Sequence, residues 1–214
     1  MTLRMGDSSD VAGIIHEHFH GNRDKLRGVE IGVFRGETSA TLLRTFPQLH
    51  LVMVDPWETY ESTHPYRESG DGCSRQTADQ QANNMAAAMV ATNLAATRRT
   101  ILPMTSERAA AYMATYVAVD PKTATLAAGD GEQPFDGRFD FVFVDGDHTY
   151  GAVKRDIELW WPLVNAGGLL CGHDIDHPRD LRGVWGVRRA VEEHAAACGL
   201  PFDVRGSCWW MVKS

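Results

Sequence analysis

Short apolar runs alternate with longer stretches of helical periodicity along most of this chain. Nearly continuous apolar runs are typical of strands that are buried on both faces of a parallel sheet. The clearest run is Phe-Asp-Phe-Val-Phe-Val, in which a single polar residue interrupts five apolar ones. Five such strands are predicted, at residues 29–33, 49–54, 100–104, 139–144 and 168–172.

Between the strands, apolar residues recur every three or four positions, which predicts amphipathic helices. The clearest stripe runs through Val153, Ile157, Trp160 and Trp161. Alternation of strands with helices is typical of an open α/β sheet with right-handed crossovers. The predicted helices cover residues 36–46, 78–96, 149–164 and 187–198, and a further helix lies within residues 1–25.

The end of the chain departs from this alternation. Residues 202–205 and 208–212 read as two short strands, and Gly206-Ser207 separates them. A two-residue turn of this kind predicts a β-hairpin. The last strand should therefore run antiparallel to its neighbour in the sheet.

Two segments lie outside the strand–helix alternation. Residues 56–98 are read as an insertion, in which the polar, aromatic-containing stretch 57–75 is a candidate lid and acceptor-recognition element. Residues 120–134 are rich in Gly, Ala and Thr and predict a loop. With 214 residues, the chain fits one domain, 1–214, better than two.

Charge, hydropathy and cysteine content argue against a nucleic-acid-binding, membrane-spanning or disulfide-rich protein. Acidic residues outnumber basic ones by 28 to 21, which disfavours sequence-independent binding to nucleic acid. No apolar run approaches the roughly 20 residues that span a bilayer, and the acidic N-terminal stretch does not resemble a signal peptide. The four cysteines show no CxxC spacing. We therefore expect a reduced, cytoplasmic protein that binds neither membranes nor nucleic acid.

Candidate chemistry is concentrated where the predicted strands end, because ligands of open α/β sheets bind at that edge. The first strand leads into Glu30, Gly32 and Gly36, a G-x-x-x-G spacing in which Phe34 replaces the second glycine of a dinucleotide fingerprint. An acid here repels phosphate but suits a cationic amine, such as that of S-adenosylmethionine. An ordinary strand-to-helix turn is the alternative.

The second and third strands end in further polar residues. Asp55 can accept hydrogen bonds from ribose hydroxyls, or it can be a turn residue before Pro56. Trp57 either stacks on an adenine or covers the loop. Thr105 or Ser106 caps the following helix, and the N-terminus of that helix, with Ser106, can also face the adenine.

The fourth and fifth strands end in clusters of ionisable groups. Asp145, Asp147 and His148 follow the fourth strand, and His173 and Asp174 follow the fifth. Oxygen ligands with at most one imidazole suit Mg²⁺ or Mn²⁺. Polar loops that only contact water are the alternative.

Together these motifs resemble class I S-adenosylmethionine-dependent methyltransferases of the methyltransferase domain 24 type. This group is related to catechol-type, caffeoyl-coenzyme-A-type and macrolide-sugar O-methyltransferases. The resemblance extends from about residue 28 to 213 and includes the motifs Asp55-Pro56-Trp57, Asp145 to Tyr150 and Trp160-Trp161-Pro162-Leu163. It implies a Rossmann-like α/β fold: a seven-stranded, mostly parallel sheet with helices on both faces and an antiparallel last strand.

The resemblance also implies roles for individual residues. Glu30, Gly32 and Gly36 would line the methionyl part of the cofactor, and Asp55 would hold its ribose. Trp57, Ser106 and Asp145 complete the expected cofactor site. The metal positions fall on Asp145, His173 and Asp174, where the histidine departs from the acid–amide or acid–acid pair of metal-dependent relatives. The general base falls on His148, or on Asp147 in its place.

The expected function is O-methylation of a hydroxyl on a small molecule or carbohydrate, with S-adenosylmethionine and with or without a divalent metal. Two alternatives remain: an NAD(P)-dependent oxidoreductase and a non-catalytic nucleoside-binding module of the same fold. A P-loop enzyme is excluded because G-x-x-x-x-G-K-[ST] is absent. The acceptor and the choice between O- and N-methylation stay open. The N-terminal helix can pack on its own sheet or on a second subunit in a homodimer.

Overall fold

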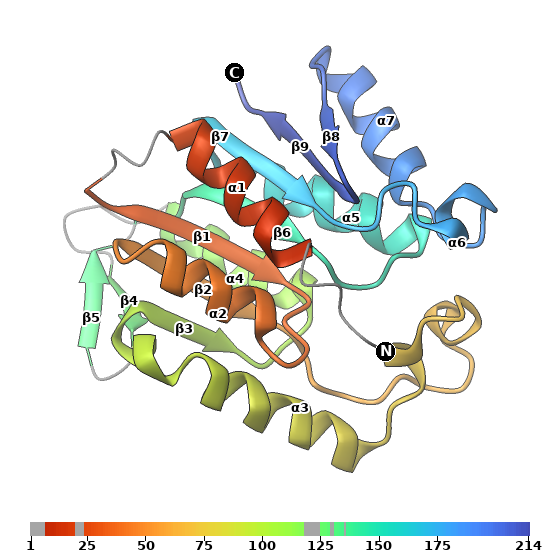
Figure 1. Ribbon diagram of the computed structural model, residues 1–214, viewed down its shortest axis with the longest axis horizontal. Helices are drawn as coiled ribbons and strands as arrows, with labels where there is room; N and C mark the ends of the chain where they lie inside the picture. Colours follow the sequence, from red (N-terminus) through yellow and green to blue (C-terminus); the bar gives the residue numbers. More distant parts are fainter. Residues whose placement is uncertain (1–6, 20–23, 118–124, 129–130, 135) are drawn as a thin grey trace.

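A seven-stranded sheet forms the centre of the computed structural model (Figure 1). The strands lie in the order β3-β2-β1-β6-β7-β9-β8. The first five are parallel to one another, and β9 pairs antiparallel with both β7 and β8. This confirms the expected Rossmann-like sheet with a reversed last strand. The structure describes residues 7–19, 24–117, 125–128, 131–134 and 136–214. The strands of this sheet are β1 (Leu26–Ile31), β2 (Leu49–Val54), β3 (Arg99–Leu102), β6 (Phe139–Val144), β7 (Val164–Gly172), β8 (Asp203–Arg205) and β9 (Cys208–Val212).

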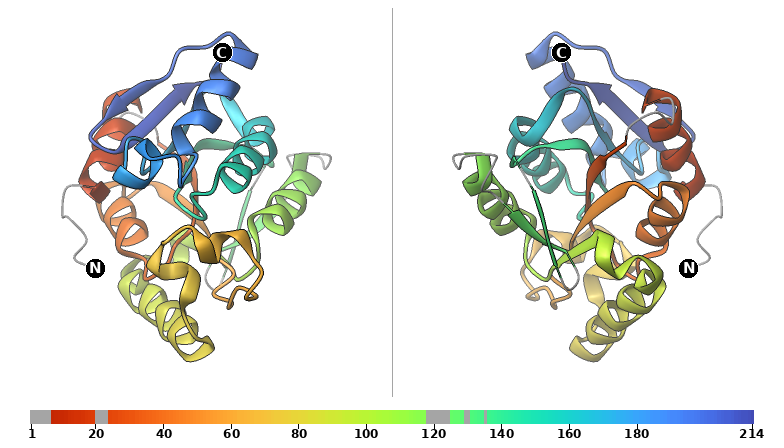
Figure 2. Two further views of the ribbon diagram at one scale, coloured as in Figure 1. Left: turned by 90° about the vertical axis from the view of Figure 1, so that its right-hand side faces the viewer. Right: turned by 90° about the vertical axis from the view of Figure 1, so that its left-hand side faces the viewer.

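Helices cover both faces of the sheet (Figure 2). One apolar core lies between the sheet and α1, α2 and α3, and the other lies between the sheet and α4, α5 and α7. Successive residues of β6 alternate between the two, because side chains of a strand point to opposite faces. The helices are α1 (Asp7–Phe19), α2 (Glu37–Thr45), α3 (Ala78–Ala91), α4 (Ser106–Val117), α5 (Tyr150–Trp160), α6 (Pro178–Leu181) and α7 (Val187–Cys198).

The N-terminal helix α1 packs on its own sheet. Its apolar stripe, Val11, Ile14, Ile15 and Phe19, is buried in the same core as α2. The stripe is therefore satisfied within one chain and is not left for a second copy. Among the helices that the structure describes, none is long and apolar enough to span a bilayer.

Several predicted strands begin or end a few residues away from their predicted positions, and three other elements differ further from the prediction. The helix predicted over 149–164 ends at Trp160, and a short 3₁₀ turn, η4 (Trp161–Leu163), leads directly into β7. Pro162 explains the early end, since proline has no N–H to donate within a helix. The helix predicted over 78–96 is divided into α3 and a 3₁₀ segment, η3 (Asn93–Arg98).

The third difference lies in residues 120–134, which were predicted to form a loop. Within this stretch, β4 (Thr125–Ala128) and β5 (Gly131–Pro134) pair antiparallel, while residues 120–124 and 129–130 lie outside the described residues. A pair of strands held by backbone hydrogen bonds needs no apolar run, so the composition gave no sign of it.

The segment between β2 and α3, residues 57–76, is here called the strap. It contains two 3₁₀ turns, η1 (Pro65–Glu68) and η2 (Gly72–Arg75). The side chain of His64 caps η1, and the carboxylate of Asp71 caps η2 by accepting the Cys73 N–H at 2.8 Å. Because side chains cap both turns, the strap has a defined shape despite its irregular backbone.

Candidate active site

The loop after β1 rests on a buried acid. Glu30 is only 1% exposed, and its carboxylate accepts a hydrogen bond from the Ser39 hydroxyl of α2. Burial raises the pKa of Glu30 well above its usual value, although the Ser39 hydroxyl opposes this. Glu30 thus lies beneath the loop, in a place where it braces the turn between β1 and α2.

Two glycines allow this loop to lie close to its neighbours. Gly32 has φ +88°, and a Cβ there would lie 2.2 Å from the backbone oxygen of Asp145. Gly36 has φ +79°, and its Cβ would lie 2.9 Å from the Cα of Ala88 in α3. Both positions therefore require glycine for conformation and for space. The packing at Gly32 also sets the loop directly against the end of β6.

Asp55, at the end of β2, fastens the same loop. One of its oxygens accepts the Phe34 N–H at 2.9 Å, and the other accepts the Trp57 N–H at 2.8 Å. Burial raises the pKa of Asp55, while these backbone donors lower it. The Trp57 indole is 7% exposed and donates to the Phe34 carbonyl at 2.8 Å. This geometry favours Trp57 as the cover of the loop over a role in stacking on adenine.

Thr105 and Ser106, at the start of α4, have different hydrogen-bond partners. The Thr105 hydroxyl accepts the Arg108 N–H at 3.5 Å, as a cap of α4 does. The Ser106 hydroxyl instead accepts the Trp160 indole N–H at 2.9 Å and also contacts the Asp156 carboxyl. Ser106 therefore joins α4 to α5 at the edge where β3 ends.

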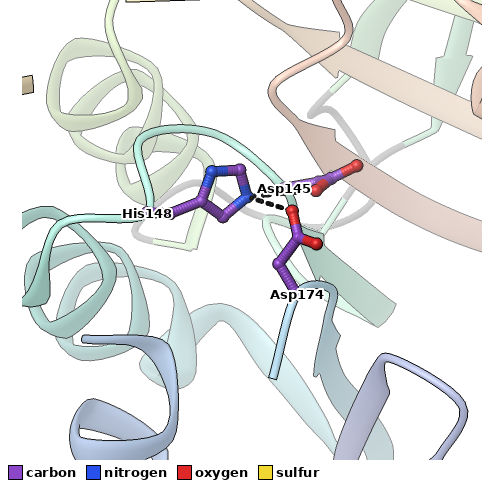
Figure 3. Close-up of side chains that lie close together, drawn as sticks. All are labelled: Asp145, His148 and Asp174. Carbon is purple, nitrogen blue, oxygen red and sulfur yellow. Dashed lines mark hydrogen bonds and ion pairs between the residues drawn. The ribbon is translucent and has the colours of Figure 1, made fainter. Parts of the chain in front are cut away.

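The ends of β6 and β7 bring the predicted acids and imidazoles together, because Val144 and Gly172 are in register. Figure 3 shows the side chains of Asp145, His148 and Asp174 close together. His148 Nε2 lies 3.4 Å from an Asp145 oxygen and 3.1 Å from an Asp174 oxygen.

The cluster has the composition of a cation site. Each of the three residues offers one ligand atom, and these atoms lie within 4.8 Å of one another. His173 lies alongside, with its Nδ1 at 3.3 Å from Asp174 and 3.9 Å from Asp145. The two carboxylates and single imidazole of this group of three suit a divalent ion of the Mg²⁺ or Mn²⁺ type.

The groups of the cluster perturb one another strongly. Burial opposes a charge on His148, but the neighbouring carboxylates outweigh burial and hold its pKa well above the usual value. Burial likewise opposes ionisation of Asp174, and His148 and His173 outweigh it, so its pKa is held far below the usual range. Burial raises the pKa of Asp145.

Asp147, the alternative base, lies next to the cluster in a turn. Its carboxylate accepts the Thr149 N–H at 2.8 Å, which stabilises the start of α5. Burial raises the pKa of Asp147, and its hydrogen bonds to Thr149 oppose this. Asp147 therefore stabilises the turn before α5, and the imidazole of His148 faces the two carboxylates.

Two residues that the sequence did not single out complete the cluster. The Asp71 carboxylate, from the strap, lies 3.2 Å from His148 Nδ1. Trp185, between α6 and α7, stacks on the His148 ring with centroids 4.4 Å apart. In the sequence Asp71 stands between two glycines, a pattern that predicts only a turn. Trp185 is a large aromatic residue in a short Gly-Val-Trp-Gly-Val stretch between charged residues, and that was the one available signal.

The family model of the methyltransferase domain Methyltransf_24 matches residues 29–175, more than half of the chain. The chain belongs to this family. The expected kinship with class I S-adenosylmethionine-dependent methyltransferases is thereby confirmed, and with it the expectation of an enzyme that transfers methyl groups. A comparison of the sequence with curated proteins found no significant match.

Solved structures of methyltransferases share the fold. The calicheamicin methyltransferase CalS11 is 14% identical, with a TM-score of 0.63, covering 98% of this chain and 80% of that one. An O-methyltransferase from Bacillus cereus, solved in complex with SAH, is 16% identical with a TM-score of 0.54, covering 99% and 83%. The O-methyltransferase NovP is 12% identical with a TM-score of 0.54, covering 97% and 79%.

Proposed function

We propose that this methyltransferase transfers the methyl group of S-adenosylmethionine to a hydroxyl on a small molecule or carbohydrate, assisted by a divalent metal. The observation that carries the proposal is the contact of Gly32 with the backbone of Asp145. It sets the loop that suits the cofactor directly beside the cluster of Asp145, His148 and Asp174. A reacting hydroxyl held by this cluster would therefore lie next to the cofactor.

The cofactor would be held by groups on three strand ends. The loop from Gly32 to Gly36 would hold the methionyl part, and Asp55 has lone pairs left for ribose hydroxyls after its two backbone contacts. Ser106 lies at the third strand end, where the adenine would reach. When bound, S-adenosylmethionine supplies an electrophilic methyl group on a sulfonium ion.

The metal would be held by Asp145 and Asp174, whose oxygens are the ligands that Mg²⁺ prefers. His173 contacts both carboxylates and would orient them or add a nitrogen ligand. When bound, a divalent cation lowers the pKa of a nearby hydroxyl and fixes the position of its oxygen.

His148 is the residue that would take the proton from the acceptor. Its Nε2 faces the space between the two carboxylates, within hydrogen-bonding distance of both. The carboxylates that raise the pKa of His148 also make it a stronger base, so its neutral form can accept a proton from an acceptor hydroxyl in this place. The remaining acceleration comes from holding acceptor and cofactor together, which contributes up to about 7–11 kcal/mol.

The functions of structurally similar proteins favour hydroxyl acceptors. One structure of CalS11 is described as a TDP-rhamnose 3'-O-methyltransferase, and it is 15% identical with a TM-score of 0.55. We therefore place a sugar hydroxyl first and a catechol-like phenol second among the acceptors. Membership of a methyltransferase family leaves the oxidoreductase and the non-catalytic module without support.

Methyl transfer from radiolabelled S-adenosylmethionine tests this proposal. The acceptors are a nucleotide sugar and a catechol, each with Mg²⁺ and with EDTA. Asp145→Asn and Asp174→Asn should lower turnover at least about 100-fold, because several kcal/mol of charge stabilisation are lost. Their affinity for S-adenosylhomocysteine should stay within a few fold of the wild type.

Asp176→Asn is the matched control, because Asp176 lies two positions from Asp174 but pairs with Arg188 at the surface. It should keep wild-type turnover. Full turnover by Asp145→Asn, or wild-type turnover that EDTA leaves unchanged, would contradict the metal-assisted mechanism.

A further inference from the structure

Asp71 is a buried acid that the strap carries to the active site from a distant part of the sequence. It is 6% exposed, and its two oxygens have different partners. One oxygen accepts the Cys73 N–H at 2.8 Å, and the other lies 3.2 Å from His148 Nδ1. The Tyr66 hydroxyl also donates to this carboxylate. Donors therefore surround Asp71, as a fixed hydrogen-bond acceptor requires.

The ring of His148 is held on its face as well as at its edge. Trp185 stacks on it with an interplanar angle of 18°, and His177 also stacks on Trp185, with ring centroids 4.3 Å apart. The Trp185 indole donates to the Ser69 carbonyl of the strap at 3.0 Å. The strap thus fixes His148 twice, directly through Asp71 and indirectly through Trp185.

We propose that Asp71 is a positioning residue that accepts the Nδ1–H of His148 and so makes Nε2 the nitrogen that exchanges a proton with the acceptor hydroxyl. This inference rests on the proposed function, in which His148 takes that proton. A neutral imidazole carries one N–H, and the hydrogen bond at one nitrogen determines which nitrogen has the free lone pair. With Nδ1–H bound to Asp71, Nε2 is the nitrogen that carries the second proton of the protonated ring toward Asp145 and Asp174, and it has the lone pair when the ring is neutral.

The hydrogen bond from Asp71 also makes the alignment of His148, the proposed base, depend on the position of the strap. Asp71 lies between the two 3₁₀ turns, so the base is aligned only when the strap occupies its observed place. The strap is then part of the catalytic apparatus, beyond its predicted part in acceptor recognition. Displacing it would leave His148 free to rotate or to adopt the other tautomer.

Asp71→Asn tests the hydrogen bond to His148 separately from the cap of η2, because an asparagine has one acceptor oxygen. The Cys73 N–H and the His148 Nδ1–H both need an acceptor, and the amide can satisfy only one of them. If its oxygen keeps the Cys73 bond, its NH₂ faces Nδ1 and favours the tautomer that carries the proton on Nε2. The lone pair then points away from the carboxylate pair.

The test is NMR of the full-length protein labelled with ¹⁵N-histidine, with His148→Gln used for assignment. In the wild type, a downfield, slowly exchanging Nδ1–H signal of His148 is expected. In Asp71→Asn this signal should be lost and kcat should fall at least about 10-fold, with the acceptor KM and the affinity for S-adenosylhomocysteine within about three-fold. Asp71→Glu keeps the charge and both oxygens, and should recover the signal and part of kcat.

Thr77→Ala is the matched control for the loss of a cap next to the strap, since Thr77 caps α3 and does not contact the cluster. It should keep both the signal and kcat. A His148 Nδ1–H signal unchanged in Asp71→Asn, or absent from the wild type, would overturn the inference. Wild-type protein that shows the signal but transfers no methyl group would instead contradict the proposed function.

Discussion

Gly32→Ala tests how tightly the cofactor loop packs against the end of β6. It should lower the free energy of unfolding by more than the cost of a left-handed backbone alone. Gly32 has φ +88°, so an alanine there pays about 1–2 kcal/mol for a left-handed backbone. Its new Cβ would also lie 2.2 Å from the Asp145 oxygen and 2.6 Å from the Gly146 Cα. Both atoms belong to backbone and cannot rotate away.

The cost of this contact follows from packing rules. An overpacked site loses about 1–3 kcal/mol, because the surrounding backbone must shift. The total for Gly32→Ala is then about 2–5 kcal/mol, out of the 5–15 kcal/mol that stabilise a typical domain. Because the shift moves the end of β6, the affinity for S-adenosylhomocysteine should also fall at least about 10-fold, which corresponds to 1.4 kcal/mol.

Gly199→Ala provides the matched control within the same chain. Gly199 has φ +65° at the end of α7, and a Cβ there meets nothing within 4 Å. It should cost only the conformational part, about 1–2 kcal/mol, and leave cofactor affinity unchanged. Gains from a stiffer unfolded chain are the same for both variants and cancel in the difference.

The assay is urea unfolding of both variants together with calorimetric titration of S-adenosylhomocysteine. With a slope of about 2–3 kcal/mol per M, the Gly32→Ala midpoint should lie about 0.5–1.5 M below that of Gly199→Ala. Equal midpoints and equal affinities would refute the tight contact between the loop and β6. The adjacency on which the proposed function depends would then lose its basis.

Other predictions concern groups around the site. Burial raises the pKa of Asp156 to about 7, so between about pH 4 and about pH 7 the folded protein holds a proton that the unfolded chain has released. Wild-type stability should fall as pH rises through this window, by up to about 4 kcal/mol, and urea unfolding should show no such fall in Asp156→Asn. Trp57→Phe leaves the Phe34 carbonyl without its indole donor and should cost about 1–2 kcal/mol of unfolding free energy. Calorimetry should find cofactor affinity within about three-fold, and a loss beyond 10-fold would indicate that the indole contacts the adenine instead. Arg98→Met removes the donor to three carbonyls near the end of α2 and should cost about 2–3 kcal/mol by urea unfolding, against less than about 0.5 kcal/mol for the exposed Arg44→Met.

The sequence predicted the sheet and the meeting of Asp145 with Asp174 for one physical reason. Parallel strands end at the same edge, so residues that follow buried apolar runs are brought together. The same reason explains why the predicted cofactor loop and Asp55 lie side by side. The reversed hairpin at the end of the chain followed from its turn residues.

Contacts made by irregular segments could not be predicted in this way. Asp71 reaches His148 across 77 positions of sequence, through a strap whose path is set by caps and by Trp185. No periodicity encodes such a path. Likewise, the bonds of Trp57 and Ser106 depend on side-chain direction, which residue type and spacing leave open.

Calorimetric titration of the wild-type protein with S-adenosylhomocysteine, with Mg²⁺ and with EDTA, is the decisive experiment for a metal-assisted methyltransferase. NADH is the control ligand. We expect micromolar or tighter binding of S-adenosylhomocysteine, no response to NADH, and a separate Mg²⁺ response that Asp145→Asn abolishes. Absence of S-adenosylhomocysteine binding under every condition would contradict the proposed function.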